Sequence, residues 1–505
     1  MKRTGDKVII NGHEYELGEK LGGGMEGSVF VSKDRPEFVI KLINTAHMGN
    51  RAKLELREHL MWLKNTIGAN NDLKNKLAVP KALVEGDDIG YIMYRATEHD
   101  SLKSYITFPS DIQQFEQWYK LNYKLKKRLQ IASYLFNSLE LIHISGLLFT
   151  DLSPNNIMVH KNKNNLVFID TDNMRRKRDS YLSVVGTDGY MAPEIYIGLN
   201  EMNKKINSVE FDKSELPKSG RLSIESDVFS AAVIVFQLLT LQHPFIGDAV
   251  EDGTAEDETA ALRCETDYIL HKNKSNISST PFVQLFDKCQ IVTPKIRDLF
   301  YRTFVDGKNN PYLRPTAIEF AEAFDEAQDL LASCEKCGSD FMYLPETENL
   351  CWDCENRTER RVVLQIFTGY EEADREKLIA DILRDNPLCG TNQRYRFVEA
   401  CSVILEENKD KYLYLRHFEK TTKRSHPFAK IALVDTISGT IRLQVVDTSI
   451  IPACYLIDRR SPQTRKRIDD LRRANEFSME QFAILFDVVQ SRVGKIETIG
   501  MLSRK

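Results

Sequence analysis

The chain has 505 residues, of which 42% are hydrophobic and 28% are charged, and its formal net charge is −4. A chain of this length exceeds one ordinary hydrophobic core, so we expect three or four folding units. The slightly acidic balance excludes a protein whose whole surface coats nucleic acid or an anionic membrane, so any such binding must be local.

The N-terminal stretch alternates polar and apolar residues and has no apolar run of the kind found in signal peptides. No stretch approaches 18 uncharged apolar residues, so we expect no transmembrane span and no membrane partner. The chain has nine cysteines, an odd number, and four of them gather between positions 334 and 354. That pattern is typical of a metal site in a reducing compartment, so we expect a cytoplasmic protein.

The first two thirds of the chain show strand patterns followed by helix patterns. Short strands are predicted within residues 6–45 and at 90–95, where β-branched and aromatic residues lie between glycines and prolines. Apolar residues at helical spacing predict helices over 51–65, 123–145, 226–241 and 316–332. Strand patterns return within 361–456, with a hairpin about Ser438 and Gly439, and the chain from Arg459 turns basic and helical.

A glycine-rich stretch lies between the first predicted strands. Gly22, Gly24 and Gly27 form the pattern G-x-G-x-x-G, and Val29 follows it. Glycines at this spacing let backbone N–H groups close on phosphates without obstruction by side chains. The same pattern also fits a tight turn between strands, and a dinucleotide-binding fold is excluded because no helix pattern follows directly.

A single lysine, Lys41, ends the strand that follows this loop. A lysine in this place can bridge phosphate oxygens if an acidic side chain holds it. The helix predicted over 51–65 offers Glu58 as the first choice and Glu55 as the second, although each alone is also consistent with a surface charge.

Polar residues of the middle of the chain suit a metal-bound nucleotide. Asp151 and Asn156 fit D-x-x-x-x-N, in which the aspartate orients a hydroxyl proton and the asparagine reaches a metal ion. Asp170 follows the apolar strand 167–169 and, with Asn156, supplies the hard oxygen ligands that Mg²⁺ prefers. Asp172 is a candidate second metal ligand, and the sequence equally allows it to cap a turn.

The order of these motifs resembles the eukaryotic-type (Hanks-type) protein kinase family across residues 1–330. The resemblance continues in Ala192-Pro193-Glu194, in Ser226-Asp227 and in Leu313-Arg314-Pro315. It implies an α+β, bilobal kinase fold with a β-rich N-lobe and an α-rich C-lobe. In that fold Asp227 would anchor the catalytic loop, and Glu194 and Arg314 would form a structural ion pair.

The resemblance implies an ATP-dependent serine/threonine protein kinase that uses Mg²⁺ or Mn²⁺ and phosphorylates protein hydroxyls. The sequence leaves open whether it also phosphorylates its own hydroxyls. Small-molecule phosphotransferases generally lack the Ala-Pro-Glu segment, which favours a protein substrate. The implied catalytic residues are Lys41, Asp151, Asn156 and Asp170. The implied nucleotide-binding residues are Gly22, Gly24, Gly27, Val29, Lys41 and Glu58, and the implied Mg²⁺ ligands are Asn156, Asp170 and Asp172.

The sequence departs from the family pattern at three places. Phe149-Thr150-Asp151 lacks the family's arginine before the aspartate, Ser153 stands where a lysine is usual, and Asp170-Thr171-Asp172 replaces Asp-Phe-Gly. These departures keep open a nucleotide-binding pseudokinase scaffold. Because Lys41, Asp151 and Asp170 are all present, we favour an active enzyme.

The four gathered cysteines form C-x-x-C, thirteen residues, C-x-x-C. Two such knuckles bring four thiolates to one tetrahedral Zn²⁺, and a site with no open ligand position is structural. We therefore predict a Cys₄ zinc ribbon over 331–358, with ligands Cys334, Cys337, Cys351 and Cys354.

The C-terminal part is expected to form a mixed α/β region of unknown role over 359–457 and a helical module over 458–505. Residues 467–497 resemble the helix-turn-helix of phage-repressor (Cro/C1-type) domains, which implies a recognition helix over 490–497. From Arg459 on, the chain has 11 Lys or Arg against 6 Asp or Glu, which permits phosphate contact. A DNA-binding regulator and a protein-docking module both remain open. The residues that would face DNA are Gln490, Ser491, Arg492 and Lys495.

Overall fold

The computed structural model describes the chain apart from residues 1, 25–26, 112, 115–116, 119–121, 178–185, 207–221, 274, 345–348, 358–361, 370–397, 415–426, 450, 452, 462–463, 489–495 and 505. It divides into two compact units. The first comprises 1–123, 130–287 and 297–320, and the second comprises 124–129, 288–296 and 321–505. Among the described residues, no helix is long and apolar enough to cross a membrane.

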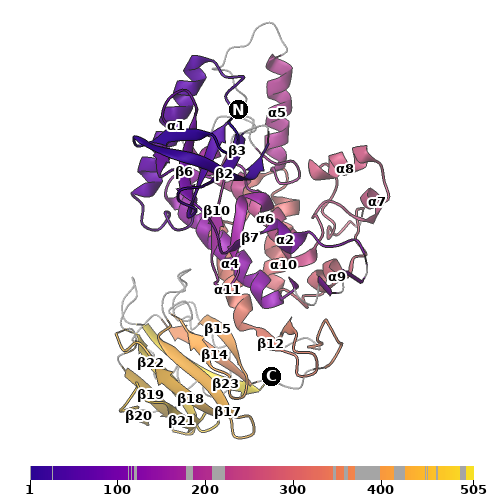
Figure 1. Ribbon diagram of the computed structural model, residues 1–505. Helices are drawn as coiled ribbons and strands as arrows, with labels where there is room; N and C mark the ends of the chain where they lie inside the picture. Colours follow the sequence, from indigo (N-terminus) through magenta and orange to yellow (C-terminus); the bar gives the residue numbers. More distant parts are fainter. Residues whose placement is uncertain are drawn as a thin grey trace. The chain divides into compact units, whose positions relative to one another are not determined.

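The first unit begins with an antiparallel sheet of six strands in the order β1-β2-β3-β4-β6-β5 (Figure 1). Its strands are β1 (Lys7–Ile10), β2 (His13–Gly23), β3 (Gly27–Ser32), β4 (Phe38–Ile43), β5 (Ala82–Leu83) and β6 (Gly90–Tyr94). β3 and β4 approach closely at Gly27, where a Cβ atom would lie 2.4 Å from the Leu42 carbonyl oxygen. Only glycine fits there without moving β4, which explains the last glycine of the motif.

Helix α1 (Asn50–Gly68) follows the fourth strand, as the sequence predicts. Its buried residues are Leu60, Leu63 and Ile67, so they define the side of the helix that packs on the unit. Leu54 and Met61 are 58% and 42% exposed, which places other apolar positions of the same helix at the surface. The rotation of α1 about its own axis, set by these buried residues, therefore decides which of its polar side chains can point into the first unit.

Short elements form the part of the unit that carries the Asp and Asn motifs. β9 (Ile157–His160) pairs with both β7 (His99–Ser101) and β10 (Leu166–Phe168), and β8 (Leu147–Leu148) pairs with β11 (Arg175–Arg176). Single 3₁₀ turns cover Pro154–Asn156 and Thr171–Asn173. The candidate residues thus lie on the turns that enter and leave a small antiparallel sheet.

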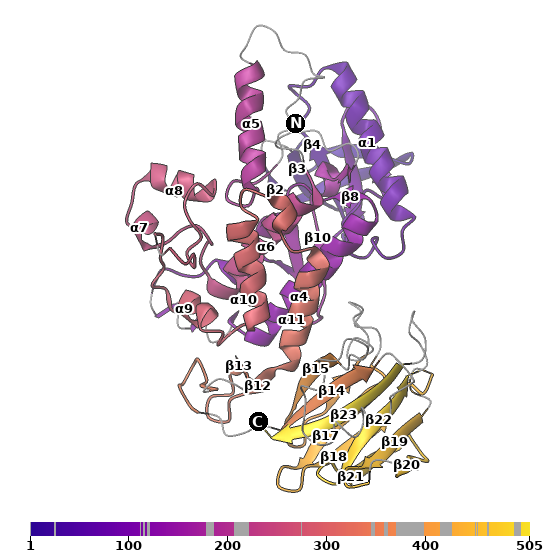
Figure 2. The ribbon, with the colours of Figure 1, turned by 180° about the vertical axis from the view of Figure 1, so that it is seen from behind.

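The rest of this unit is helical, as expected for the second lobe. The helices are α2 (Lys103–Ile106), α4 (Leu125–Ile144), α5 (Pro193–Ile206), α6 (Ile224–Thr240), α7 (Asp248–Glu251), α8 (Ala255–Leu262), α9 (Pro281–Asp287) and α10 (Pro294–Tyr301). The first residues of α4 and α10 belong to the second unit, as does most of α11 (Ala317–Asp329). Nearly all of α6 is buried, and it lies among the other helices in both views (Figures 1 and 2). Its start is fixed by a capping box between Ser223 and Ser226.

An ion pair joins the start of α5 to the segment before α11. Arg314 Nη1 and Nη2 donate to the two Glu194 carboxylate oxygens, both at 2.7 Å. The Arg314 side chain is fully buried and also donates to the Gly307 and Glu225 carbonyl oxygens. The predicted Glu194–Arg314 pair is therefore confirmed, in the bidentate geometry that favours arginine over lysine.

The second unit is a β structure. β12 (Leu331–Ser333) and β13 (Asp340–Met342) form a small hairpin. A six-stranded sheet follows in the order β15-β14-β23-β22-β19-β20, and a four-stranded sheet in the order β16-β17-β18-β21 (Figure 1). Their strands are β14 (Val362–Gly369), β15 (Val398–Leu405), β16 (Lys411–Leu413), β17 (Ala429–Asp435), β18 (Thr440–Val445), β19 (Ala453–Asp458), β20 (Arg465–Arg467), β21 (Asn475–Ser478), β22 (Phe482–Val488) and β23 (Ile496–Arg504).

These two sheets share one hydrophobic core, to which both contribute buried side chains such as Ile366, Ile431, Ile441 and Ile484. The hairpin predicted about Ser438 and Gly439 is present between β17 and β18. The elements that the structure describes within the expected mixed α/β region, 359–457, are all strands, and residues 370–397 and 415–426 of that region lie outside the described residues. The boundary expected at 457/458 is wrong, since β23 pairs with β14.

The helix-turn-helix expected over 467–497 is wrong as well. Most of the described residues there belong to β21, β22 and β23, and β22 is a central strand between β19 and β23. Its apolar run, Phe482 to Phe486, fits a buried strand as well as a helix. The run forms a strand because it pairs with β19 on one side and β23 on the other. Gln490, Ser491, Arg492 and Lys495 lie outside the described residues.

We expect Arg314→Ala to lower the free energy of unfolding of the first unit by about 3 kcal/mol or more, because it leaves the Glu194 carboxylate and two backbone carbonyls without their donor. The control is Arg302→Ala, which removes a half-exposed pair with Glu319 and should cost about 1 kcal/mol or less. Urea unfolding curves measure both. Equal losses in the two variants would contradict the structural role of the buried pair.

A second prediction concerns His243, which is buried and neutral. Its Nε2 lies 2.8 Å from the Gly189 carbonyl oxygen, and its Nδ1 accepts from the Phe245 N–H. Burial lowers the pKa of His243 from 6.5 to about 4, although the Gly189 contact opposes the shift. Between pH 6.5 and pH 4 the histidine is protonated in the unfolded chain but not in the folded one. The contribution of neutral His243 to the free energy of unfolding is therefore complete above pH 6.5 and is lost as the pH falls toward 4.

The His243 contribution to this loss is about 3 kcal/mol at most. His243→Gln keeps a donor but does not titrate, so its stability should fall less between pH 6.5 and pH 4. Urea unfolding at pH 7, 5.5 and 4.5 compares the two proteins. The idea fails if the variant loses as much stability as the wild type over this range.

Candidate active site

A cavity of about 680 Å³ brings most of the predicted nucleotide-site residues together. The predicted residues that line it are Gly22, Gly24, Gly27, Val29, Lys41, Asn156 and Asp170. Its walls also carry apolar side chains that the sequence did not single out, namely Leu21, Val39, Ala78, Met93, Met158 and Ile169. Apolar walls with a few charged and polar groups suit a flat ring system attached to a charged chain.

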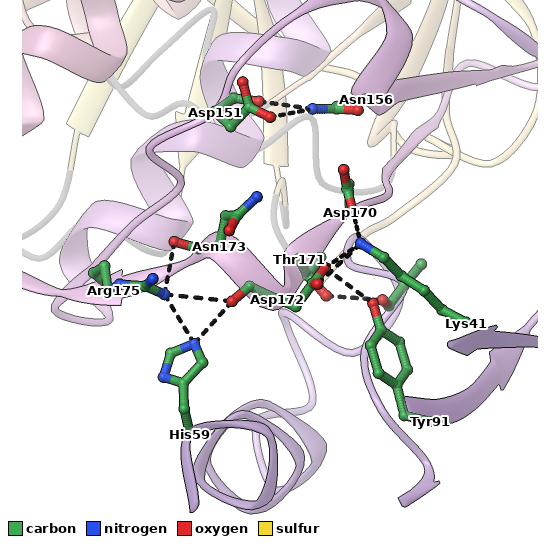
Figure 3. Close-up of polar contacts among 11 residues, drawn as sticks. Lys41, His59, Tyr91, Asp151, Asn156, Asp170, Thr171, Asp172, Asn173 and Arg175 are labelled. Atoms are coloured by element: carbon green, nitrogen blue, oxygen red, sulfur yellow. Dashed lines mark hydrogen bonds and ion pairs between the residues drawn. The ribbon is translucent and has the colours of Figure 1, made fainter. Parts of the chain in front are cut away.

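Lys41 lines this cavity, and two carboxylates meet its ammonium group (Figure 3). Lys41 Nζ donates to Asp172 Oδ1 at 2.7 Å and Oδ2 at 2.9 Å, and it also donates to Asp170 Oδ1. The Tyr91 hydroxyl donates to Asp172 Oδ1 at 3.1 Å. This cluster is the most buried group of charges in the site, and burial makes each partner dependent on the others.

The pKa values show how the charge is shared within the cluster. Burial alone would lower the pKa of Lys41, but the carboxylates of Asp172 and Asp170 outweigh it and raise this pKa. Burial would raise the pKa of Asp172, but Lys41 outweighs it and lowers this pKa. Burial and the neighbouring Asp172 charge raise the pKa of Asp170 to about 6. Asp172 is thus the ionised partner of Lys41, and Asp170 is the less satisfied of the two carboxylates.

The expected pair between Lys41 and Glu58 is not found in the described part of the chain. Glu58 is exposed and lines a different surface hollow, beside Arg57 and Lys64. Glu55, the second choice, pairs with Arg51 on the outer face of α1. The reason is the phase of the helix, whose buried side is set by Leu60, Leu63 and Ile67.

The residue of α1 that reaches the site is His59, which the sequence analysis missed. Its Nε2 lies 2.9 Å from the Asp172 carbonyl oxygen and 3.0 Å from Arg175 Nη1 (Figure 3). Burial and the Arg175 charge lower the pKa of His59 to about 4, so the imidazole is neutral near pH 7. The sequence signal for His59 is its position next to Glu58. Neighbouring residues of a helix point about 100° apart, so His59 can face the site when Glu58 does not.

The Asp170-Thr171-Asp172 segment is held on several sides. Asp170 has a left-handed backbone with φ of 60°, which is uncommon for a residue other than glycine. The Thr171 hydroxyl donates to the Ala78 carbonyl oxygen at 2.9 Å, and the Thr150 hydroxyl donates to the Asn173 carbonyl oxygen at 2.8 Å. The threonine that replaces the family's arginine therefore ties the loop bearing Asp151 to the segment bearing Asp172.

Asp151 and Asn156 lie side by side on that loop (Figure 3). Asn156 Nδ2 donates to the Asp151 carbonyl oxygen at 2.9 Å and to its Oδ2 at 3.0 Å. The Thr187 hydroxyl donates to Asp151 Oδ1 at 2.9 Å. Asp227 accepts the backbone N–H groups of residues 149 and 150 at 2.8 and 3.1 Å, which confirms its predicted anchoring role.

The four cysteines of the predicted ribbon come together in the second unit. Their sulfur atoms all lie within 4.8 Å of one another, and pairs are 3.5 and 3.6 Å apart. Four sulfurs about 2.3 Å from a tetrahedral Zn²⁺ would be about 3.8 Å apart, so the set fits this ion. Each C-x-x-C lies within a short antiparallel pairing, one between β12 and β13 and one closed by the Leu350–Arg357 bridge.

Comparison with known proteins points to one family. A family model described as the protein kinase domain matches residues 15–312, more than half of the chain. Calcium-dependent protein kinase 25 of Arabidopsis thaliana is 23% identical over 252 residues, which cover 47% of this chain and 40% of that protein. Serine/threonine-protein kinase PrkC of Bacillus subtilis is 22% identical over 240 residues, 46% of this chain and 32% of that protein.

A third relative is the probable serine/threonine-protein kinase PknB of Lactococcus lactis, 25% identical over 122 residues, or 24% of this chain and 16% of that protein. The chain therefore covers 40% or less of the length of these three relatives. The family model, over residues 15–312, covers nearly all of the first unit, which holds the cavity and the Lys41 cluster.

Proposed function

Because the chain belongs to the protein kinase domain family, we propose that it is a serine/threonine protein kinase, which transfers the γ-phosphoryl group of Mg-ATP to hydroxyl groups of proteins. The observation that carries the proposal is the convergence of Lys41, Asp170 and Asn156 on one cavity, with Asp151 bonded to Asn156 beside it. Such a set can align a triphosphate with an incoming hydroxyl group.

Each residue has a distinct task in this proposal. The glycines at 22, 24 and 27 leave room for backbone N–H groups to close on the phosphates, and Lys41 donates to phosphate oxygens. Asn156 and Asp170, whose side chain is 25% exposed, would hold Mg²⁺ or Mn²⁺. Bound ATP and its metal ion supply the transferred group and neutralise its charge.

Asp151 would orient the substrate hydroxyl and accept its proton. Its Oδ2 is fixed by Asn156 and its Oδ1 by Thr187, so the carboxylate is already aligned. Ser153, where the family carries a lysine, is buried, so the cation usual at that place is missing here. The proposal therefore assigns the stabilisation of the transferred charge to Lys41 and the metal ion.

We also propose that Cys334, Cys337, Cys351 and Cys354 hold a structural Zn²⁺. The support is the compact sulfur set and its surroundings: Cys334 and Cys351 belong to a buried cluster with Val363 of β14 and Ile404 of β15. Trp352 packs against this cluster and donates from Nε1 to the Asp340 carbonyl oxygen at 2.7 Å. The ion would fix the ribbon to the six-stranded sheet, within the second unit.

We predict that Asp151→Ala and Asp170→Ala each reduce phosphate transfer from radiolabelled ATP to self or to general protein substrates by about 100-fold or more, because proton acceptance or metal binding is lost. Asp252→Ala, at an exposed position after α7, is the matched control and should transfer phosphate like the wild type. A wild type that binds nucleotide without any transfer would favour a pseudokinase scaffold.

The zinc proposal predicts one Zn²⁺ per chain by elemental analysis of the purified protein. Cys337→Ser should lose the ion and lower the unfolding temperature of the second unit, because the free energy of metal binding contributes directly to the stability of the folded ribbon. Cys264→Ser replaces a buried cysteine of the first unit and should retain the ion. Zinc retained by Cys337→Ser, or absent from the wild type, would contradict the proposal.

A further inference from the structure

We infer that Asp172 and Tyr91 together position Lys41 toward the nucleotide phosphates, a task for which the sequence predicted Glu58. The inference rests on the proposed kinase function and assigns Asp172 to the lysine, whereas the resemblance to the kinase family implied a metal ligand at this position. It makes Asp172 and Tyr91 positioning residues that act through Lys41.

The first support is the hydrogen bonding of the Asp172 carboxylate. Both of its oxygens already accept from the protein: Oδ1 from Lys41 at 2.7 Å and from Tyr91 at 3.1 Å, and Oδ2 from Lys41 at 2.9 Å. Its side chain is 10% exposed, against 25% for Asp170. A metal ligand must offer an uncovered oxygen to the ion and its phosphates, and Asp170 meets this condition better.

The second support is the position of the two donors on the sheet. Lys41 of β4 stands directly opposite Tyr91 of β6 in the antiparallel register, so both side chains leave the same face. The Tyr91 side chain is fully buried, and Lys41 is 5% exposed. The sheet thus presents a fixed pair of donors to one carboxylate, which limits where the lysine can point.

The third support is the attachment of Asp172 itself. The Thr171 hydroxyl is bonded to the Ala78 carbonyl oxygen, and His59 of α1 lies against the Asp172 carbonyl oxygen (Figure 3). The carboxylate is therefore held by its own backbone on one side and by Tyr91 on the other. If Asp170 turns to a cation, Lys41 keeps a buried carboxylate partner.

This arrangement gives the two aspartates separate tasks. Asp170 shares Lys41 in the structure and faces the cavity, whereas Asp172 is absent from the cavity lining. A lysine held by a residue of the metal-binding segment does not depend on a glutamate from α1. The exposed position of Glu58 then has no consequence for the Lys41 geometry.

Calorimetric titration with ADP tests the inference, once with Mg²⁺ and once with EDTA. We expect Tyr91→Phe to weaken ADP binding about fivefold to tenfold in both buffers, because it removes one hydrogen bond that fixes the lysine anchor. Asp172→Asn should weaken binding at least as much, also in both. The matched controls are Tyr312→Phe and Asp72→Asn, both at exposed positions, which should bind like the wild type.

The same titrations in a Lys41→Met background separate positioning from general packing. If Tyr91 acts through Lys41, the loss caused by Tyr91→Phe should disappear there, whereas a packing defect would persist. Circular dichroism checks that each variant folds. Should Asp172→Asn unfold, the shape-conserving Tyr91→Phe variant still decides the question.

The inference is overturned by wild-type affinity in Tyr91→Phe, by a Tyr91→Phe loss that persists in the Lys41→Met background, by a loss in Asp172→Asn that occurs only with Mg²⁺, or by a loss of the same size in Glu58→Gln. Lack of ADP binding by the wild type would overturn it as well. A wild type that shows the expected binding losses but transfers no phosphate would contradict the kinase function while leaving the Lys41 assignment intact.

Discussion

The buried charge cluster of Lys41, Asp170 and Asp172 is the constraint on which the candidate site depends. A lysine that is 5% exposed cannot stay charged without a carboxylate partner, and here two carboxylates from one turn supply it. The cluster joins the β1–β6 sheet of the first unit to the segment after β10. The same contacts that fix the cavity therefore also orient the ammonium group that would meet the phosphates. Fold and site are coupled through a few hydrogen bonds.

Much of this site follows from sequence spacing. The glycine motif, Lys41, Asn156 and Asp170 meet at one cavity, as the order of motifs predicts. Such residues can be found because each chemical task needs a particular residue type at a strand end or a tight turn. The Glu194–Arg314 pair is predicted from the resemblance of Ala192-Pro193-Glu194 and Leu313-Arg314-Pro315 to kinase-family segments, and the structure shows it.

The errors arise where the answer depends on contacts between distant segments. The lysine partner depends on the phase of α1 and on the register that places Tyr91 opposite Lys41, and neither can be read from one motif. The C-terminal error has a similar origin. The apolar run from Phe482 to Phe486 fits a helix locally, and only its pairing between β19 and β23 makes it a strand.

A crystal structure with ADP and Mn²⁺ tests the central claim most directly, because anomalous scattering locates the ion. The account predicts a manganese peak coordinated by Asp170 and Asn156, with the Lys41 ammonium still bonded to Asp172 and also reaching a phosphate oxygen. A peak coordinated by Asp172, or a Lys41 ammonium turned to Glu58, would contradict it.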